Sequence, residues 1–220
     1  MSMSKMSNVA IAVQTVLATA LNITAITKAA PGIVTVTHSY ANGDYVVLNI
    51  SGGMSQLNNK VFRVCNVSTT VSFQLEDVSG GTGIDTSSYD TFVTGTVSKV
   101  TLGTSITTAT AIQISGGDFG MIDTTTIHTN QKSEVPGAAN PLKFELTNLW
   151  DPTDTAQKAI KIASDLQSQL VFKFTFGTGG KIMVFVGYVG FVNAPNGNAQ
   201  DKITSAMSIT AFGVPNYYSA

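Results

Sequence analysis

Residues 169–212 read QLVFKFTFGTGGKIMVFVGYVGFVNAPNGNAQDKITSAMSITAF, and this stretch decides the fold. Its first part, residues 171–176, alternates apolar and polar side chains, which is typical of a strand with one buried face. Residues 182–192 are apolar on both faces, so both sides of that strand need cover. Residues 203–212 alternate again after an Asn-Gly turn at 196–197. The stretch therefore predicts a meander whose middle strand is too apolar to stand alone.

An amphipathic helix is predicted just before this meander, over residues 155–170. Asp154 or Thr153 can cap its first turn, because a short side-chain oxygen accepts hydrogen bonds from free backbone N–H groups. Apolar positions recur at helical spacing, and we expect them to pack on one face of the meander. These positions are Ala156, Ala159, Ile160, Ala163, Leu166 and Leu170, whereas Gln157, Lys158, Lys161, Asp165 and Gln167 are expected to face away.

Short strands are predicted along the rest of the chain. Residues 9–24 form the first, and region 26–100 combines short strands with glycine-rich turns, which favours a small barrel. The polar stretch 123–141 is predicted to be a loop, and loops of this length usually carry a function. The strands expected in region 26–100 are 33–37, 45–50, 61–67, 71–76 and 92–97, and those expected after it include 111–115, 119–123 and 142–146.

The composition describes a β-rich protein with a sparsely charged surface. Of the 220 residues, 43% are hydrophobic, which is enough for a substantial core. Only 11% are charged, against roughly 25% in typical soluble domains. The net charge is -1 and Arg63 is the only arginine, so the chain lacks the basic surface and the arginines that base-specific DNA binding uses.

The apolar run at residues 9–21 is similar to the centre of a signal peptide. However, Gln14, Thr15 and Thr19 interrupt it, and it is too short and too polar to span a bilayer. We therefore expect a strand here, with no signal peptide and no membrane insertion.

The residue types that perform chemistry are few and scattered. His38 and His128 have no second ligand at metal-binding spacing, and a surface or turn position is expected for each. Cys65 lies between valines in a strand-like segment, which favours a small buried residue over a nucleophile. Asp151 and Asp154 could pair as carboxylates, but helix capping accounts for both. We predict no catalytic residue, no cofactor-binding residue and no metal site.

Two glycine-rich segments are similar to phosphate-binding loops. Residues 116–120 are followed by neither Lys-Ser/Thr nor a helix, and residues 177–181 join two predicted strands. A turn is the better interpretation for both segments.

Region 26–76 contains several short turn and strand motifs that resemble a known module. They resemble a small β-barrel inserted in phage tail proteins, sometimes labelled as similar to the first-catalytic-cysteine-half domain of ubiquitin-activating enzymes. Ubiquitin chemistry does not follow, since Cys65 has no activating neighbour in sequence. The motifs are ITKA (26–29), VTVTH (34–38), NGD (42–44), GMSQLN (53–58), FRV (62–64) and FQL (73–75).

The framework outside this region resembles the tail tube protein family of long-tailed phages. The resemblance implies a mainly β fold, a tail-tube-type β-sandwich or barrel with one flanking α-helix, formed by residues 1–24 and 103–220. Residues 25–102 would then be an inserted small β-barrel domain. The residues that carry the resemblance are GMIDTT (120–125), PG (136–137), LKFEL (142–146), the helix, and the closing strands up to GVP (213–215).

The resemblance also implies a function. Tail tube proteins are structural virion proteins, made in the host cytoplasm, that form stacked hexameric rings as a conduit for DNA ejection. The implied partners are the chain itself, tape measure and terminator proteins, and passing DNA bound without sequence specificity; enzymatic activity is not implied.

Three structural expectations follow. The apolar middle strand of the meander is expected to find its missing neighbours in sister molecules, because ring closure removes exposed strand edges. Residues 123–141 are expected to contact the adjacent ring, with the 26–100 module projecting outward. Lumen-facing positions are expected to carry few lysines, since each neutralised phosphate would retain the passing DNA.

The alternative function is a β-rich adhesin or carbohydrate-binding surface module. Its active part would be the small barrel in region 26–100, making weak contact with host-surface glycans. The aromatic residues that could stack on sugars are Tyr40, Tyr45, Tyr89 and Phe92, although packing in the protein interior also accounts for them.

Overall fold

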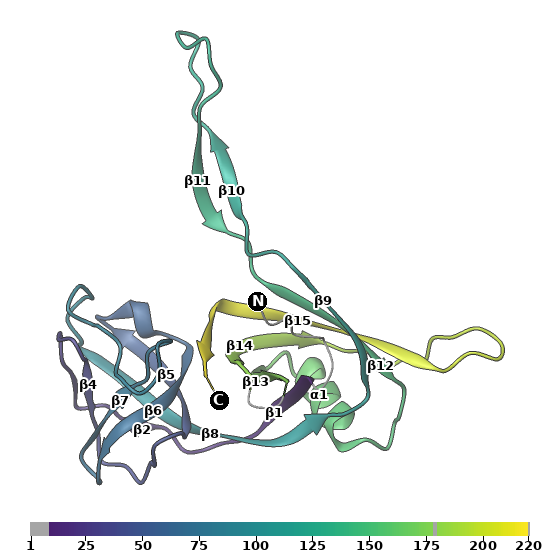
Figure 1. Cartoon of the computed structure of the whole chain (residues 1–220), viewed down its shortest axis with the longest axis horizontal. Coiled ribbons are helices and arrows are strands. Elements are labelled where there is room, and N and C mark those ends of the chain that lie inside the picture. Colours follow the sequence, from purple (N-terminus) through teal and green to yellow (C-terminus); the bar gives the residue numbers. More distant parts are fainter. Residues whose placement is uncertain (1–8, 178–179, 220) are drawn as a thin grey trace.

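The structure, a computed structural model, describes residues 9–177 and 180–219. It is mainly β, with one curled sheet, one helix and a long hairpin that stands away from the body (Figure 1). Residues 1–8 of the predicted framework and Thr178–Gly179 of the predicted turn lie outside the described residues. The strands of the first half are β1 (Val9–Leu17), β2 (Leu21–Asn22), β3 (Ala25–Ile26), β4 (Ile33–Thr35), β5 (Tyr45–Gly52), β6 (Lys60–Ser68), β7 (Ser72–Leu75) and β8 (Thr94–Ile106), with a 3-10 turn at Ser55–Leu57.

The main sheet has 13 strands in the order β3-β4-β7-β6-β5-β8-β1-β13-β14-β15-β12-β9, with β2 beside β8. All of its pairings are antiparallel, and β10 pairs only with β11 in a separate two-stranded sheet. The remaining elements are β9 (Ala109–Ser115), β10 (Phe119–Asp123), β11 (Glu134–Ala139), β12 (Lys143–Leu149), α1 (Thr155–Asp165), β13 (Gln169–Phe176), β14 (Ile182–Gly190) and β15 (Thr204–Tyr218).

The predicted meander is confirmed as β13, β14 and β15, which pair in sequence order. Phe172, Phe174 and Phe185 of the meander point to the face that α1 covers, and Phe144 of β12 joins them there. The rings of Phe144, Phe174 and Phe185 stack with centroids 4.8 to 5.7 Å apart. Ile160 of α1 is fully buried against this layer. The helix therefore covers one face of the meander, as its apolar spacing predicts.

The second face of β14 is covered within the same chain. Val184 and Val186 pack in a separate cluster with Val61 of β6, Val100 of β8 and Tyr218 at the end of β15. These partners come from distant parts of the sequence, because the sheet curls until β6 approaches β14 and the end of β15. The expectation that sister molecules supply the neighbours of this apolar strand is therefore wrong.

The helix is shorter than its apolar pattern predicts. It ends at Asp165, and Gln167 adopts a φ of 50°, which ends the helical run before β13 begins. Leu166, predicted to be buried, is 72% exposed, whereas Gln157, predicted to face solvent, is fully buried. The Gln157 amide donates to the Leu149 carbonyl at 2.8 Å, so hydrogen bonding offsets the burial of its polar group.

Region 26–100 contains the predicted short strands around its own apolar core. Phe73, Val46 and Leu48 are fully buried at its centre. Its last strand differs from the prediction: β8 extends to Ile106 and pairs with β5 in its first half and with β1 in its second. One continuous strand thus passes from the small core into the core under α1.

The C-terminal end of β15 reaches further than predicted and contacts β6. A positive φ of 77° at Gly213 redirects the strand, and the Asn216 amide donates to the Val61 carbonyl at 2.6 Å. The Tyr218 hydroxyl accepts a hydrogen bond from the Arg63 backbone N–H at 3.1 Å, and the Arg63 guanidinium lies 4.9 Å from the centre of the Tyr218 ring. These contacts hold the C-terminal end of β15 against region 26–100.

Arg63 also forms a nearly buried ion pair with Glu76, and the Glu76 carboxylate accepts a further hydrogen bond from Gly81 N–H. The hydrogen bond from Arg63 is the main reason that the pKa of Glu76 is lowered from 4.5. Because the pKa of Glu76 is lower in the folded protein than in the unfolded chain, its carboxylate stabilises the fold at pH values above the unfolded-state pKa. This contribution is lost as the pH falls through the folded-state pKa of Glu76.

We expect Glu76→Gln to lower the free energy of unfolding at pH 7 by on the order of 3 kcal/mol, because it leaves the Arg63 charge without its partner. Urea denaturation at pH 7 and pH 3 checks this: the difference between wild type and variant should shrink at pH 3. The control is Glu145→Gln at an exposed carboxylate, expected within about 0.5 kcal/mol of wild type. Equal losses from the two variants would contradict the prediction.

Candidate functional site

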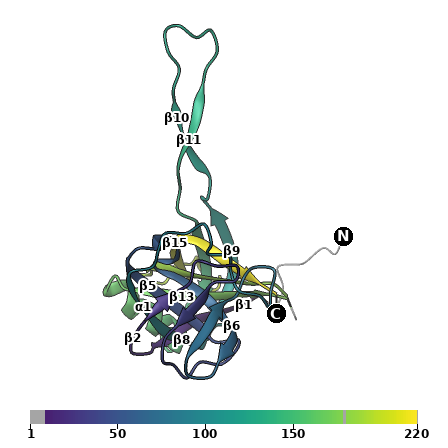
Figure 2. The ribbon, with the colours of Figure 1, turned by 90° about the vertical axis from the view of Figure 1, so that its left-hand side faces the viewer.

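The most prominent surface feature is a two-stranded arm formed by β10 and β11. Figures 1 and 2 show it standing clear of the body in two perpendicular views. The stretch 123–141, predicted to be a loop, therefore contains half of a hairpin, with Ile122 opposite Val135 and Asp123 opposite Glu134. The sequence of β11, EVPGAA, does not predict a strand, because Pro136 and Gly137 interrupt any alternation of apolar and polar residues.

The arm exposes large apolar side chains that nothing else in the described chain covers. More than half of the surface of Phe119, Met121 and Ile122 is accessible, and Ile127 at the tip is 96% exposed. Exposed apolar groups clustered on one element usually mark a contact surface. The apolar residues in 119–122 were the sequence signal for the first strand of the arm, but the sequence contained no such signal for its partner strand β11.

The arm leaves the body through a double glycine. Gly116 and Gly117 adopt φ values of 80° and 83°, and a Cβ at Gly116 would lie 2.3 Å from the Pro141 carbonyl oxygen. The Gly117 N–H donates to the Asn140 carbonyl at 3.1 Å, which holds the two sides of the base together. Only glycine combines this backbone conformation with such a close approach. Residues 116–120, similar in sequence to a phosphate loop, thus form the start of the arm.

We expect Gly116→Ala to destabilise the arm base by about 1–3 kcal/mol, because it adds backbone strain and a clash with Pro141. Amide hydrogen exchange of the arm measures this, and protection should fall at residues 117–140. Gly120→Ala is the matched control, since its new Cβ would lie 3.7 Å from the nearest atom. Unchanged exchange in Gly116→Ala would contradict the predicted role of the glycine.

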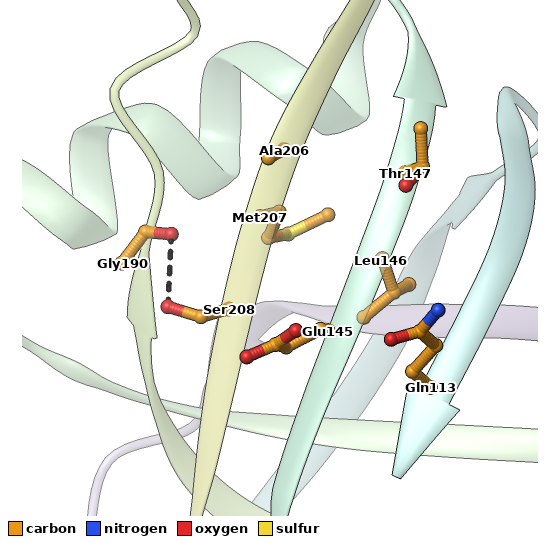
Figure 3. A pocket seen from close by; sticks show the side chains of 8 residues that line it. All are labelled: Gln113, Glu145, Leu146, Thr147, Gly190, Ala206, Met207 and Ser208. Carbon is orange, nitrogen blue, oxygen red and sulfur yellow. Dashed lines mark hydrogen bonds between the residues drawn. The ribbon is translucent and has the colours of Figure 1, made fainter.

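A second candidate surface is the face of β9, β12 and β15 that points away from α1. In Figure 3, α1 lies behind these strands, and Glu145 and Ser208 are seen close together beside Gly190. The Ser208 hydroxyl donates to the Gly190 carbonyl at 3.4 Å, and a shallow hollow of about 380 Å³ lies among these residues. The cross-strand register places on this open face Ala111, Gln113, Ser115, Lys143, Glu145, Thr147, Ala206, Ser208 and Thr210.

The open face is polar, small and nearly neutral. Lys143 and Glu145 are the charged members of that register set, so their formal charges cancel. Hydroxyl, amide and methyl groups dominate the rest, and such a surface can contact a polyanion without retaining it strongly.

The third candidate surface is the free edge of β9. Among the residues that the structure describes, this strand is the last in the sheet order and pairs with β12 on one side, which leaves its other edge unpaired there. Most of its seven residues are exposed, including Ile114. A strand edge of this length offers unpaired backbone donors and acceptors to another strand.

The residues considered for chemistry are not brought together. Cys65 is buried, which confirms the buried-residue interpretation, and this burial raises the pKa of its thiol to about 11. His38 lies in the irregular segment between β4 and β5 and is buried there, and its Nδ1 accepts a hydrogen bond from Tyr40 N–H at 2.9 Å. A surface position is therefore wrong for His38, whereas His128 is exposed on the arm. Asp154 caps α1 by accepting from Gln157 N–H at 2.8 Å, as predicted.

The aromatic residues proposed for sugar stacking are engaged in packing. Tyr40 is buried in the small core, where Tyr89 and Phe92 also pack, and Tyr45 packs against the cluster around Val61. Tyr40 is buried, and the other three are half-buried. The carbohydrate-binding alternative therefore gains no support from this surface.

Over residues 9–177 and 180–219, no three His, Cys, Asp or Glu side chains are grouped as metal ligands would be. No helix in the same ranges has the length and apolarity needed to cross a bilayer.

The comparison with protein families agrees with the architecture. The family model described as phage tail tube protein, TTP, matches residues 52–220, from the end of β5 to the end of the chain. No curated protein matches the chain. Because the match covers most of the sequence, including the arm, the helix and the meander, this chain belongs to the phage tail tube protein family and is a structural component of the phage tail.

Proposed function

We propose that this chain assembles into hexameric rings that stack into the tail tube, the conduit through which DNA is ejected. The observation that carries the proposal is the free edge of β9, a seven-residue strand at one end of the main sheet, whose other end is the two-residue strand β3. A ring in which each β9 edge pairs with a strand of the next subunit would remove this edge. Family membership supports self-assembly of this kind.

In this proposal the open face of β9, β12 and β15 lines the bore. The face lies opposite α1, so the helix would be on the outside of the ring. Among the paired residues on this face, Lys143 is the lysine. DNA would pass without sequence-specific binding because the face offers little positive charge. A high-resolution structure of the tube showing several lysines in the bore would contradict this assignment.

The arm serves in this proposal as the contact with the adjacent ring, and residues 25–102 form a module inserted in the framework of residues 1–24 and 103–220. The module has its own core, which supports the division, although β8 joins it firmly to the framework. Tape measure and terminator proteins are the proposed tail partners. The protein would be made in the host cytoplasm before it is built into the virion.

Negative-stain microscopy of the purified protein, with averaging of end views and side views, tests the assembly. Sixfold rings and striated tubes are the expected result. Dispersed monomers at high concentration, or closed particles without an axial repeat, would contradict the proposal. Stacked rings with another symmetry would agree with the proposed tube but contradict the proposed hexamer.

A further inference from the structure

The tip of the arm carries one large apolar side chain in an uncharged setting. Residues 124–131 read TTTIHTNQ and contain no Asp, Glu, Lys or Arg. Ile127 is 96% exposed within this loop, while Thr126 and Thr129 are hydrogen-bonded to each other across it. The tip therefore has a local conformation that presents a single apolar group, which water solvates poorly.

A matching apolar hollow of about 450 Å³ lies at the opposite end of the arm, where its strands leave the body. We name it the arm-base groove. Phe212, Val214 and Tyr217 contribute to its lining and remain 46% to 75% exposed, which is unusual for side chains of this size gathered on one strand. The lining, free of Asp, Glu, Lys and Arg, consists of Gly117, Ala139–Leu142, Ala211–Pro215 and Tyr217.

We propose that the arm-base groove of one subunit receives Ile127 from the arm of a second copy of this chain. The inference rests on the stacking role proposed above and names the two surfaces that would carry it. Neither surface contains a formally charged side chain, so the contact would bury no unpaired charge. A second copy is the occupant because the exposed apolar tip and the apolar hollow belong to the same chain and need cover in equal numbers.

The geometry favours a repeating contact over a closed pair. Residues 117 and 127 are ten positions apart, and an extended chain of that length reaches about 33 Å at roughly 3.3 Å per residue. Figures 1 and 2 show that the arm is at least as long as the body is tall in the direction of the arm, so the tip can pass the body of a neighbouring copy. A tip-to-base contact joins two different surfaces, and such heterologous contacts repeat into filaments unless the rotation closes them.

Disulfide trapping tests the pairing directly. The variant Ile127→Cys/Val214→Cys, assembled and then oxidised, should give a ladder of covalent multimers on a non-reducing gel, since each copy would be joined to the next. The control is Ile127→Cys/Val192→Cys, whose second cysteine lies in the equally exposed loop after β14. Absence of the ladder from assembled Ile127→Cys/Val214→Cys, or an equal ladder from the control, would overturn the proposal.

Assembly measurements give a second readout. Ile127→Asp should raise the critical concentration for tube growth at least tenfold, and Val214→Asp should do the same, whereas Ile127→Leu should stay within threefold of wild type. Each variant should melt at the wild-type temperature, because both positions are exposed in the isolated subunit. Tubes formed by Ile127→Asp at the wild-type concentration would refute this contact while leaving the tube function intact. Failure of the wild-type protein to form any tubes would overturn the proposed function and this contact together.

Discussion

Removal of the arm is expected to give a folded subunit that cannot form tubes. The change replaces residues 119–139 by two glycines, which close the chain between Asp118 and Asn140. These two residues are already joined, since Asn140 N–H donates to the Asp118 carbonyl at 2.8 Å. The arm strands pair with each other and not with the main sheet, so the two main cores keep their contacts. Circular dichroism should show a native melting transition, and microscopy should show no stacked rings.

A narrower deletion of residues 124–139 is a poorer experiment. It would remove β11 and leave β10 without its partner, so loss of assembly could follow from an unpaired strand. The matched control for the full removal shortens the loop after β14 by deleting residues 198–200, which are exposed and outside the strands. That variant should still form tubes. Tubes of normal length from the armless variant would contradict the role given to the arm.

The second large effect is expected from Tyr218→Ala, which should lower the free energy of unfolding by about 3–5 kcal/mol, as for other buried aromatic residues cut to alanine. Tyr218 is 2% exposed and packs with Val61, Val184 and Val186, so it fills the space between β6 and β14. Burial raises the pKa of its hydroxyl above the ordinary value of 10. Urea denaturation followed by fluorescence measures the loss.

Tyr218→Phe separates the ring from its hydroxyl. It keeps the packing and removes the acceptor for Arg63 N–H, so the expected loss is about 1–3 kcal/mol. If the contact joins region 26–100 to the framework, wild type should unfold in one transition, and Tyr218→Ala should broaden or split it. A loss below about 1 kcal/mol in Tyr218→Ala, with an unchanged single transition, would show that other contacts hold the two regions together.

The local pattern of apolar and polar residues predicted those strands and the helix that bury one face. The alternation in 171–176 and 203–212 identified β13 and β15, and the helical spacing after Asp154 identified α1, because each pattern reports a single buried face. The same reasoning failed at the ends. Leu166 continues the apolar spacing, but the positive φ of Gln167 ends the helix, and periodicity carries no information on where the chain turns away.

The arm shows a second limit of local pattern. β11 has the sequence EVPGAA, which shows no alternation and has one β-branched residue, Val135. β11 is extended because it pairs with β10, and this pairing cannot be recognised from the sequence of β11 alone. The double glycine at 116–117 was visible as a turn, yet its role in directing an arm depends on the approach of Pro141, more than twenty residues later.

The sequence by itself determined that this is a mainly β protein with a doubly apolar strand, predicted at 182–192, and an amphipathic helix before the meander that contains it. It also carried the resemblance to tail tube proteins that the family match confirms. Only the tertiary structure decided what covers the second face of that strand. Hydrophobic periodicity states that a face is buried and leaves its partner unspecified, and here Val61, Val100 and Tyr218 reach β14 because a long sheet curls back on itself. In the proposed assembly, sister molecules therefore contact the free edge of β9 and the exposed arm, and β14 is covered within its own chain.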